Sequence, residues 1–221
     1  MYGLTRKGVA VKKVIIFDLD GTLVDSMPVG VGIVLGYLQE KNIPYPSDIV
    51  TILTPLGYKG SAKYIAEHFT EEILEETIYE YFKQQTLQAY GETIPLKPHV
   101  KETLEELRCR GHRMSVLTAS PSLLTELCLK RLGVYDLFDF VWSMDDFGMT
   151  KANPEIYKEA AKRMGVGVTD CVMADDNLNV LKTAKQAGMY VFGVYDDSSK
   201  EVEEEMKAVA DKYVYDLSEL L

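Results

Sequence analysis

The feature that most restricts the fold of this chain is an alternation of short apolar runs with longer helical patterns. Each apolar run is rich in β-branched residues and ends abruptly at polar residues, which is typical of a buried strand. Strands that alternate with helices pair into a mostly parallel sheet with helices on both faces. We therefore predict an α/β fold with a Rossmann-like sheet, whose strands lie at 13–17, 114–117, 140–142, 171–174 and 190–194.

The helical patterns between these runs have clear ends. Ser120-Pro121 and Asn153-Pro154 each place proline after a polar residue, which predicts an N-cap followed by proline at the first helical position. Each pattern also stops at a glycine, the residue that most readily takes the left-handed conformation that ends a helix. The patterns predict helices over 100–110, after 121, after 154 and over 178–187.

Residues 26–95 interrupt the alternation, because they contain three helical patterns (29–41, 61–69 and 70–90) and no convincing strand. Pro95 and Pro98 mark the return to the alternating pattern. We expect an all-helical cap domain at 26–95, inserted into a core domain formed by 1–25 and 96–221. Inserts of this kind are placed at loops near a functional site, where they act as lids.

Composition and charge exclude several classes of function. The 221 residues are 47% apolar with a formal net charge of −10, which fits a globular chain and disfavours nucleic acid or an anionic membrane as a partner. No apolar run is long enough to cross a membrane, and the first residues, MYGLTRKGVAVKK, lack the apolar region of a signal peptide. The three scattered cysteines fit neither a disulfide framework nor a zinc site. We therefore expect a cytoplasmic protein.

Two acidic pairs follow two of the predicted strands. Asp18 and Asp20 come after the first strand, and Asp175 and Asp176 follow the strand at 171–174. Either pair alone is also compatible with a turn or a helix cap. Because the carboxyl ends of parallel strands lie at one edge of a sheet, we expect the two pairs to meet there. Close carboxylates repel each other, and a divalent cation with oxygen ligands, such as Mg²⁺, offsets that repulsion.

Two further side chains are expected at the same edge. Thr118 follows the strand at 114–117, so that its hydroxyl and the amides of Ala119 and Ser120 would meet an anion before the next helix. Lys151 immediately precedes another helix. Taken singly, Thr118 reads as a helix cap and Lys151 as an exposed surface charge. A carboxylate nucleophile, a second carboxylate, a metal cluster, a hydroxyl and a lysine together make a phosphoryl-transfer site.

Four segments in a fixed order resemble the motifs of a known family. FDLDGT (17–22), VLTAS (116–120), KANP (151–154) and MADDNLN (173–179) are similar to those of the haloacid dehalogenase superfamily of phosphohydrolases. The helical insert resembles the helical, C1-type cap of the branch that contains phosphoglycolate phosphatases and β-phosphoglucomutases. The third motif departs from the family pattern, because Lys151 is followed by Ala152 and not by proline.

The resemblance implies a role for each matching residue. Asp18 matches the nucleophile that becomes an aspartyl phosphate, and Asp20 matches the acid and base that serves the leaving group and then water. Thr118, together with the amide of Ala119, matches the phosphoryl-binding position. Lys151 matches the lysine that holds the nucleophile and the phosphate.

The resemblance also implies a Mg²⁺ site formed by Asp18, the backbone carbonyl of Asp20, and the Asp175-Asp176 pair. The fourth motif of the family often has an acidic residue four positions after the first, where a count from Asp175 reaches Asn179. Counting back from Gly188 instead places Asp176 in the ligand position, which keeps the helix length of the family. We therefore expect Asp176 to be a ligand in preference to Asp175.

The function expected from these residues is Mg²⁺-dependent hydrolysis of a small phosphorylated metabolite. Asp20 disfavours the dehalogenase and P-type ATPase branches of the superfamily, which carry other residues there. A phosphosugar mutase with the same site is the main alternative, and a phospho-accepting signalling module fits less well, because its acidic pair precedes the acceptor aspartate.

In the insert, Lys59 lies in a segment expected to be a glycine-flanked turn before a helix, where caps carry a specificity loop. It reads either as a substrate-binding residue or as a solvated lysine.

Overall fold

The structure, a computed structural model, describes residues 14–53, 56–70 and 73–221. The chain forms two compact units. The α/β unit comprises the described residues up to Val24 together with Pro95–Leu221, and the helical unit comprises Asp25–Ile94. Lys13, which was expected in the first strand, lies outside the described residues. Among the helices of the described residues, none is both long enough and apolar enough to span a membrane.

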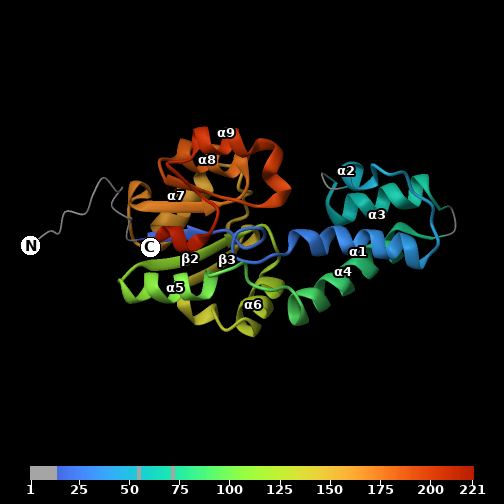
Figure 1. Ribbon diagram of the computed structural model, residues 1–221, viewed down its shortest axis with the longest axis horizontal. Helices are drawn as coiled ribbons and strands as arrows, with labels where there is room; N and C mark the ends of the chain where they lie inside the picture. The colour runs from blue at the N-terminus through green and yellow to red at the C-terminus, as the bar shows by residue number, and fades with distance from the viewer. Residues whose placement is uncertain (1–13, 54–55, 71–72) are drawn as a thin grey trace, which may run out of the picture. The chain divides into compact units, whose positions relative to one another are not determined.

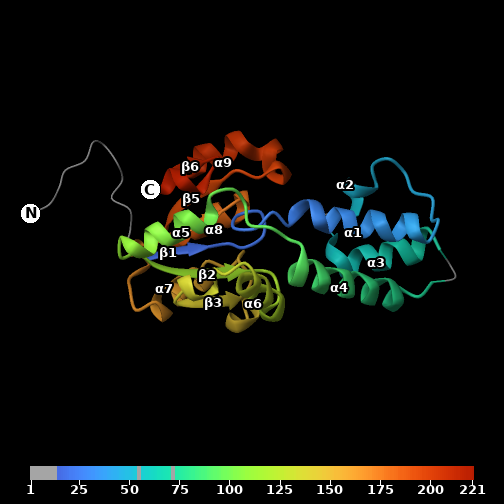
Figure 2. The same ribbon diagram turned by 60° about the horizontal axis from the view of Figure 1, so that its bottom comes forward.

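The α/β unit is built on a six-stranded sheet in the order β3-β2-β1-β4-β5-β6. Every neighbouring pair is parallel, as the alternating pattern predicts. Figure 2 shows β6, β5, β1, β2 and β3 in this order from top to bottom. The strands are β1 (Val14–Phe17), β2 (Arg113–Thr118), β3 (Phe140–Ser143), β4 (Cys171–Asp175), β5 (Tyr190–Val194) and β6 (Lys212–Val214).

The strands are apolar because both faces of the sheet are covered. All four residues of β1 are at most 1% exposed, which explains why this strand is a continuous apolar run rather than an alternating one. Helices α7, α8 and α9 lie on one face, where their apolar side chains join those of the strands in one core cluster (Figure 1). Helices α5 and α6 lie on the other face (Figure 1). The helices are α5 (Val100–Cys109), α6 (Ser122–Arg131), α7 (Glu155–Arg163), α8 (Leu178–Ala187) and α9 (Glu203–Val209).

The starts of two helices differ from the prediction. Pro121 and Pro154 occupy the N-cap position and not the first helical position, so that each helix begins one residue later. Of the two polar residues expected as caps, Asn153 accepts at Oδ1 from the amide of Glu155 at 3.0 Å, whereas the Ser120 hydroxyl donates to Asp20. Short 3₁₀ helices complete the unit: η2 (Tyr135–Leu137), η3 (Met144–Phe147), η4 (Val168–Asp170), η5 (Asp197–Val202) and η6 (Leu217–Leu220).

The helical unit has a core of its own, formed by residues such as Tyr37, Leu38, Ile65 and Phe82. The glycine-flanked turn expected around Lys59, at 56–61, is wrong, because the helix already begins at Gly57. Gly57 enters the helix with φ +61°, a conformation that glycine adopts without strain. The helices are α1 (Met27–Glu40), α2 (Ile49–Leu53), α3 (Gly57–His68) and α4 (Glu75–Glu92).

Candidate active site

The strand register brings the predicted site residues together. Phe17, at the end of β1, pairs with Val116 of β2 on one side and with Ala174 of β4 on the other. Asp18 continues this alignment, since its amide donates to the carbonyl of Ala174 at 2.9 Å. The residues that follow these strands therefore share one edge of the sheet, where open α/β folds bind their ligands.

Three buried carboxylates form a cluster at this edge. Asp18, Asp175 and Asp176 are 7%, 1% and 7% exposed. Each offers a carboxylate oxygen, and these oxygens lie within 4.8 Å of one another. Burial of several like charges at such distances is unfavourable unless a cation or a proton offsets them.

The pKa values in the cluster reflect this crowding. Burial raises the pKa of Asp18 well above its usual 3.8, and the Asp175 and Asp176 carboxylates raise it further, while Lys151 opposes the shift. Burial and the neighbouring Asp175 raise the pKa of Asp176 from 3.8 to about 7. One lysine faces three carboxylates, so the cluster holds less positive charge than negative charge.

Lys151 is buried within this cluster and is not an exposed surface charge. Its ammonium group donates to Asp18 Oδ1 and, at 2.9 Å, to Asp175 Oδ2. Although burial lowers the pKa of Lys151, the attraction of Asp175 and Asp18 outweighs it and keeps the ammonium group charged. The Tyr157 hydroxyl, on α7, donates to the carbonyl of Lys151 at 2.7 Å and so fixes the backbone from which this side chain extends.

Asp175 and Asp176 have different partners. Asp175 Oδ2 accepts from Lys151, and its Oδ1 accepts from the amide of Asn177 at 2.8 Å. Asp176 Oδ1 accepts from the Thr22 hydroxyl at 2.8 Å. Asp175 is thus bonded through both oxygens to donors of the protein, an arrangement suited to orienting Lys151. Asp176 is the better placed of the two to accept a cation.

Gly21 makes room for the carboxylate of Asp176. It has φ +81°, and a β-carbon on it would lie 2.5 Å from Asp176 Oδ2. Real β-carbons do not approach an atom so closely, so any other residue at this position would displace the Asp176 carboxylate and strain the backbone. Gly21 therefore meets two requirements at once, a left-handed backbone and the close approach of a carboxylate.

Ser120 connects the loops after β1 and β2. Its hydroxyl donates to Asp20 Oδ2 at 2.6 Å, and its amide donates to Thr118 Oγ1 at 3.0 Å. The amide of Ser120 therefore points to the Thr118 side chain, which differs from the expected anion-binding orientation. Thr118 itself is 1% exposed at the end of β2, and Ala119 is exposed beside it.

Three residues of the site make contacts that were not predicted from the sequence: Thr22, Ser120 and Tyr157. The hydroxyls of Thr22 and Ser120 bond to carboxylates that lie 154 and 100 residues away in sequence, and no local pattern signals such pairs. The Asp-Gly-Thr sequence and the Ser120 position after a strand are the only local indications. Lys59 belongs to the helical unit, where it is exposed on α3.

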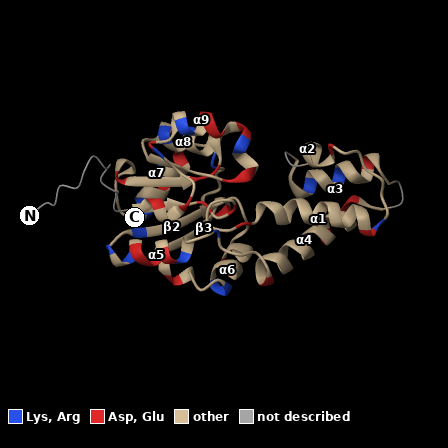
Figure 3. Ribbon diagram, in the orientation of Figure 1, with Lys and Arg blue, Asp and Glu red and all other residues tan. Residues whose placement is uncertain are grey.

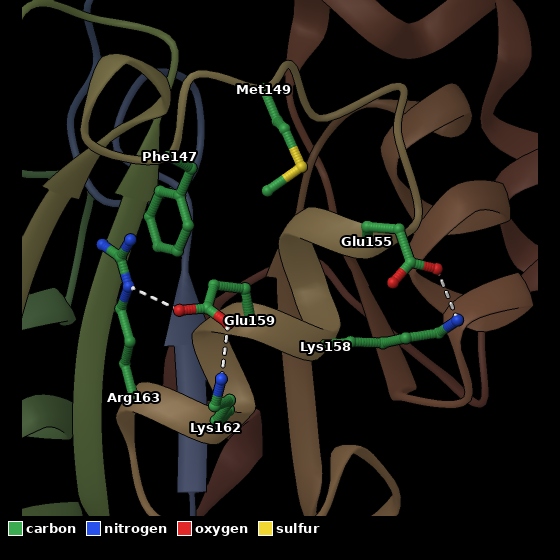
Figure 4. Close-up of a pocket in the computed structure, with 7 residues that line it drawn as sticks. All are labelled: Phe147, Met149, Glu155, Lys158, Glu159, Lys162 and Arg163. Atoms are coloured by element: carbon green, nitrogen blue, oxygen red, sulfur yellow. Dashed lines mark hydrogen bonds and ion pairs between the residues drawn. The ribbon is translucent and has the colours of Figure 1, made fainter.

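A surface pocket of about 540 Å³ lies elsewhere on the α/β unit. It is lined mainly by α7, and its charged side chains pair with one another, as in Lys158–Glu155 and Arg163–Glu159 (Figure 4). None of the carboxylates of the cluster lines it. Lys and Arg also alternate with Asp and Glu over the helices of this unit (Figure 3), without a basic stripe. The acidic cluster therefore remains the candidate site.

The donor set of the cluster fits a divalent cation. Its ligands are carboxylate oxygens, which suit hard cations such as Mg²⁺ and Ca²⁺ and not the softer metals that prefer thiolates or imidazoles. A divalent cation would also offset the like charges that raise the pKa values of Asp18 and Asp176. The residues present are therefore suited to such an ion.

Comparison with known proteins adds to this geometry. Residues 12–188 match the family model described as haloacid dehalogenase-like hydrolase. The chain is 31% identical to a phosphoglycolate phosphatase of Colwellia psychrerythraea, over 83% of this chain and 84% of that protein. It is 29% identical to the pyrophosphatase PpaX of Bacillus velezensis, over 81% and 82% of the two chains. The crystal structure of a predicted phosphoglycolate phosphatase from Haemophilus somnus superimposes with a TM-score of 0.75 at 25% identity, covering 96% and 98% of the two chains.

Proposed function

Given that the chain belongs to the haloacid dehalogenase-like hydrolase family and is a phosphatase within it, we propose that it hydrolyses a small phosphorylated metabolite through an aspartyl phosphate on Asp18. The observation that carries this proposal is the buried Lys151 between Asp18 and Asp175. A lysine in this position holds the nucleophilic carboxylate in a fixed orientation and is close enough to contact a phosphoryl group bound to it.

In the first step, an oxygen of the Asp18 carboxylate attacks phosphorus, and the bond from phosphorus to the leaving oxygen breaks. Lys151 and the hydroxyl of Thr118 stabilise the charge on the phosphoryl oxygens. The protonated Asp20 gives its proton to the leaving oxygen, which departs as an alcohol or, for an anhydride, as a phosphate.

In the second step, Asp20 acts as a base. Its carboxylate takes a proton from water, the water oxygen attacks phosphorus, and the bond between phosphorus and Asp18 breaks. This returns the Asp18 carboxylate and releases inorganic phosphate. The hydrogen bond from the Ser120 hydroxyl, at 2.6 Å, holds the Asp20 carboxylate at the edge of the site.

We propose that Asp18, Asp176 and the backbone carbonyl of Asp20 hold Mg²⁺. When bound, the ion neutralises part of the charge on the phosphoryl group and on the carboxylates. Thr22 orients Asp176 through its hydroxyl, and Asp175 orients Lys151. In this assignment Asp175 orients the lysine and Asp176 binds the metal.

We further propose that the helical unit serves as the cap that excludes water and selects the leaving group. Lys59, exposed at the start of α3, is the residue that we assign to binding the leaving group when that group is anionic. Its replacement by methionine is expected to raise KM for an anionic substrate and to leave kcat nearly unchanged.

The proposed function is tested by measuring phosphate release from a panel that contains 2-phosphoglycolate, pyrophosphate and hexose phosphates. We expect release that requires Mg²⁺ and stops on chelation, and we expect Asp18→Asn to abolish it. Conversion of a hexose phosphate to its isomer without phosphate release would instead indicate a mutase. A stable aspartyl phosphate without turnover would indicate a signalling module.

A further inference from the structure

Lys97 lies where the chain re-enters the α/β unit after the helical unit. Leu96 forms an antiparallel bridge with Val24, and the amide of Lys97 donates to the carbonyl of Leu23 at 3.0 Å. The backbone of Lys97 is therefore fixed directly beside the loop that follows β1 and carries the Asp-x-Asp-Gly-Thr sequence.

The ammonium group of Lys97 makes three hydrogen bonds. It donates to the carbonyl of Gly21 at 2.6 Å, to the carbonyl of Tyr195 at 2.6 Å and to Asp196 Oδ2 at 3.0 Å. These bonds use all three of its donors. The side chains of Lys97 and Asp196 are only 16% and 7% exposed, so water competes weakly for these bonds. Lys97 thus joins the loop after β1 to the loop after β5.

The Gly21 carbonyl belongs to the peptide bond that precedes Thr22. The hydroxyl of Thr22 bonds to Asp176, and Gly21 itself is the residue against which the Asp176 carboxylate packs. Movement of this one peptide bond would therefore displace both groups that hold Asp176 in place.

We propose that Lys97 is a positioning residue for the acidic cluster. By holding the Gly21 carbonyl, it fixes the peptide that orients Asp176 through Thr22, and it fixes the adjoining carbonyl of Asp20. The effect of Lys97 on turnover rests on the proposed phosphatase function, whereas the effect of Lys97 on the order of the loop after β1 does not. A lysine that merely stabilised the fold would leave the local order of this loop and its metal affinity unchanged.

The experiment compares Lys97→Met with Lys185→Met. Lys185 is a matched control, because it also bonds to a carbonyl, that of Val209 at 2.6 Å, and to an aspartate, Asp211 at 3.0 Å, away from the cluster. Hydrogen–deuterium exchange of the peptide that covers residues 18–25 reports loop order, since the amides of Leu23 and Val24 donate within this loop to Leu19. The Mg²⁺ concentration that half-saturates binding in isothermal titration calorimetry reports metal affinity without turnover.

For Lys97→Met we expect exchange of this peptide to be at least about tenfold faster and the half-saturating Mg²⁺ concentration to be about tenfold higher. Lys185→Met should match the wild type in both. Where the protein has phosphatase activity, kcat of Lys97→Met should fall more than KM rises. Exchange and metal affinity equal to the wild type in a folded Lys97→Met would overturn the proposal.

A second variant keeps the test decisive if Lys97→Met does not fold. Asp196→Asn retains the lysine and both of its carbonyl bonds and weakens the third, while the asparagine oxygen can still accept from the amide and hydroxyl of Ser198. It should show a smaller increase in exchange of the same peptide, of about two- to threefold. Unchanged exchange in Asp196→Asn would count against the proposal. If the wild type releases no phosphate from any ester, the proposed function fails while the exchange measurement still tests Lys97.

Discussion

The ammonium group of Lys151, in the segment between η3 and α7, is hydrogen-bonded to the carboxylate of Asp18 at the end of β1. Replacing Lys151 by methionine leaves Asp18 and Asp175 buried without the ammonium group that lies between them. We expect kcat to fall by about 10²- to 10³-fold, the usual effect of removing one group that stabilises transition-state charge. Steady-state phosphate release measures this. Lys158→Met, which removes an exposed partner of Glu155 on α7, should retain wild-type activity, and equal activity of the two variants would contradict the role of Lys151.

Gly21 gives a second prediction, because Gly21→Ala places a methyl group 2.5 Å from the Asp176 carboxylate at φ +81°. We expect a loss of stability of about 1–3 kcal/mol from the strained backbone and a loss of most of the activity, since Asp176 must move. Urea unfolding and phosphate release measure the two effects. Gly36→Ala is the control: nothing lies within 4 Å of that position in α1, so the alanine should stabilise the protein by about 0.5–1 kcal/mol. A fully active Gly21→Ala would show that the packing of Asp176 is unimportant.

The different partners of Asp175 and Asp176 predict different phenotypes for their asparagine variants. Asp176→Asn should raise the Mg²⁺ concentration for half-maximal activity by at least about tenfold, because it weakens a metal ligand. Asp175→Asn should mainly lower kcat, because it disturbs the orientation of Lys151. Titration of activity with Mg²⁺ separates these effects. The reverse pattern would mean that Asp175 is the ligand.

The pair formed by His99 and Asp216 predicts a pH dependence of stability away from the site. His99 Nδ1 lies 2.6 Å from Asp216 Oδ2, and the hydrogen bond to Asp216, with a smaller effect of Glu102, raises the pKa of His99 above 6.5. Burial raises the pKa of Asp216, but the hydrogen bonds from Ser218 and His99 outweigh it and hold this pKa below 3.8.

The sign of each shift sets the pH window of the effect. A raised histidine pKa stabilises the fold below pH 6.5 and loses its effect as pH rises through the folded value. A lowered aspartate pKa stabilises above pH 3.8 and loses its effect as pH falls through the folded value. The stability difference between the wild type and His99→Asn should therefore be largest at about pH 4–6.5 and shrink above it. Asparagine tolerates the φ of +57° at this position, and urea unfolding across this range makes the measurement. A difference that does not vary with pH would disprove the coupling.

Most of the sheet was predictable from the sequence, because its strands are buried on both faces and so form continuous apolar runs. The predicted runs at 140–142, 171–174 and 190–194 are each strands in the structure. The strand β6, with only the three residues Lys212–Val214, was missed because it is too short for such a run and pairs with β5 alone. The helix α2 was missed for the same reason, since its five residues Ile49–Leu53 contain little more than one turn.

The meeting of Asp18 with Asp175 and Asp176 was also predictable, since it follows from where parallel strands end. The contact of Lys151 with Asp18 was implied only by the family resemblance, and the hydroxyl contacts of Thr22 and Ser120 were not predicted. These contacts depend on the path of the loops after the strands, which brings together residues that are 100 or more positions apart in sequence, as with Thr22 and Asp176. A lysine before a helix has the same local sequence whether its side chain extends into solvent or into a carboxylate cluster.

Chemical trapping tests most directly whether Asp18 carries the phosphoryl group. Protein mixed with substrate and Mg²⁺, then quenched with borohydride, converts an aspartyl phosphate to homoserine, which tandem mass spectrometry assigns to one position. We expect homoserine at position 18, only when substrate is present, and none in Asp18→Asn. Turnover with no trapped residue at position 18, or homoserine at another aspartate, would contradict the account.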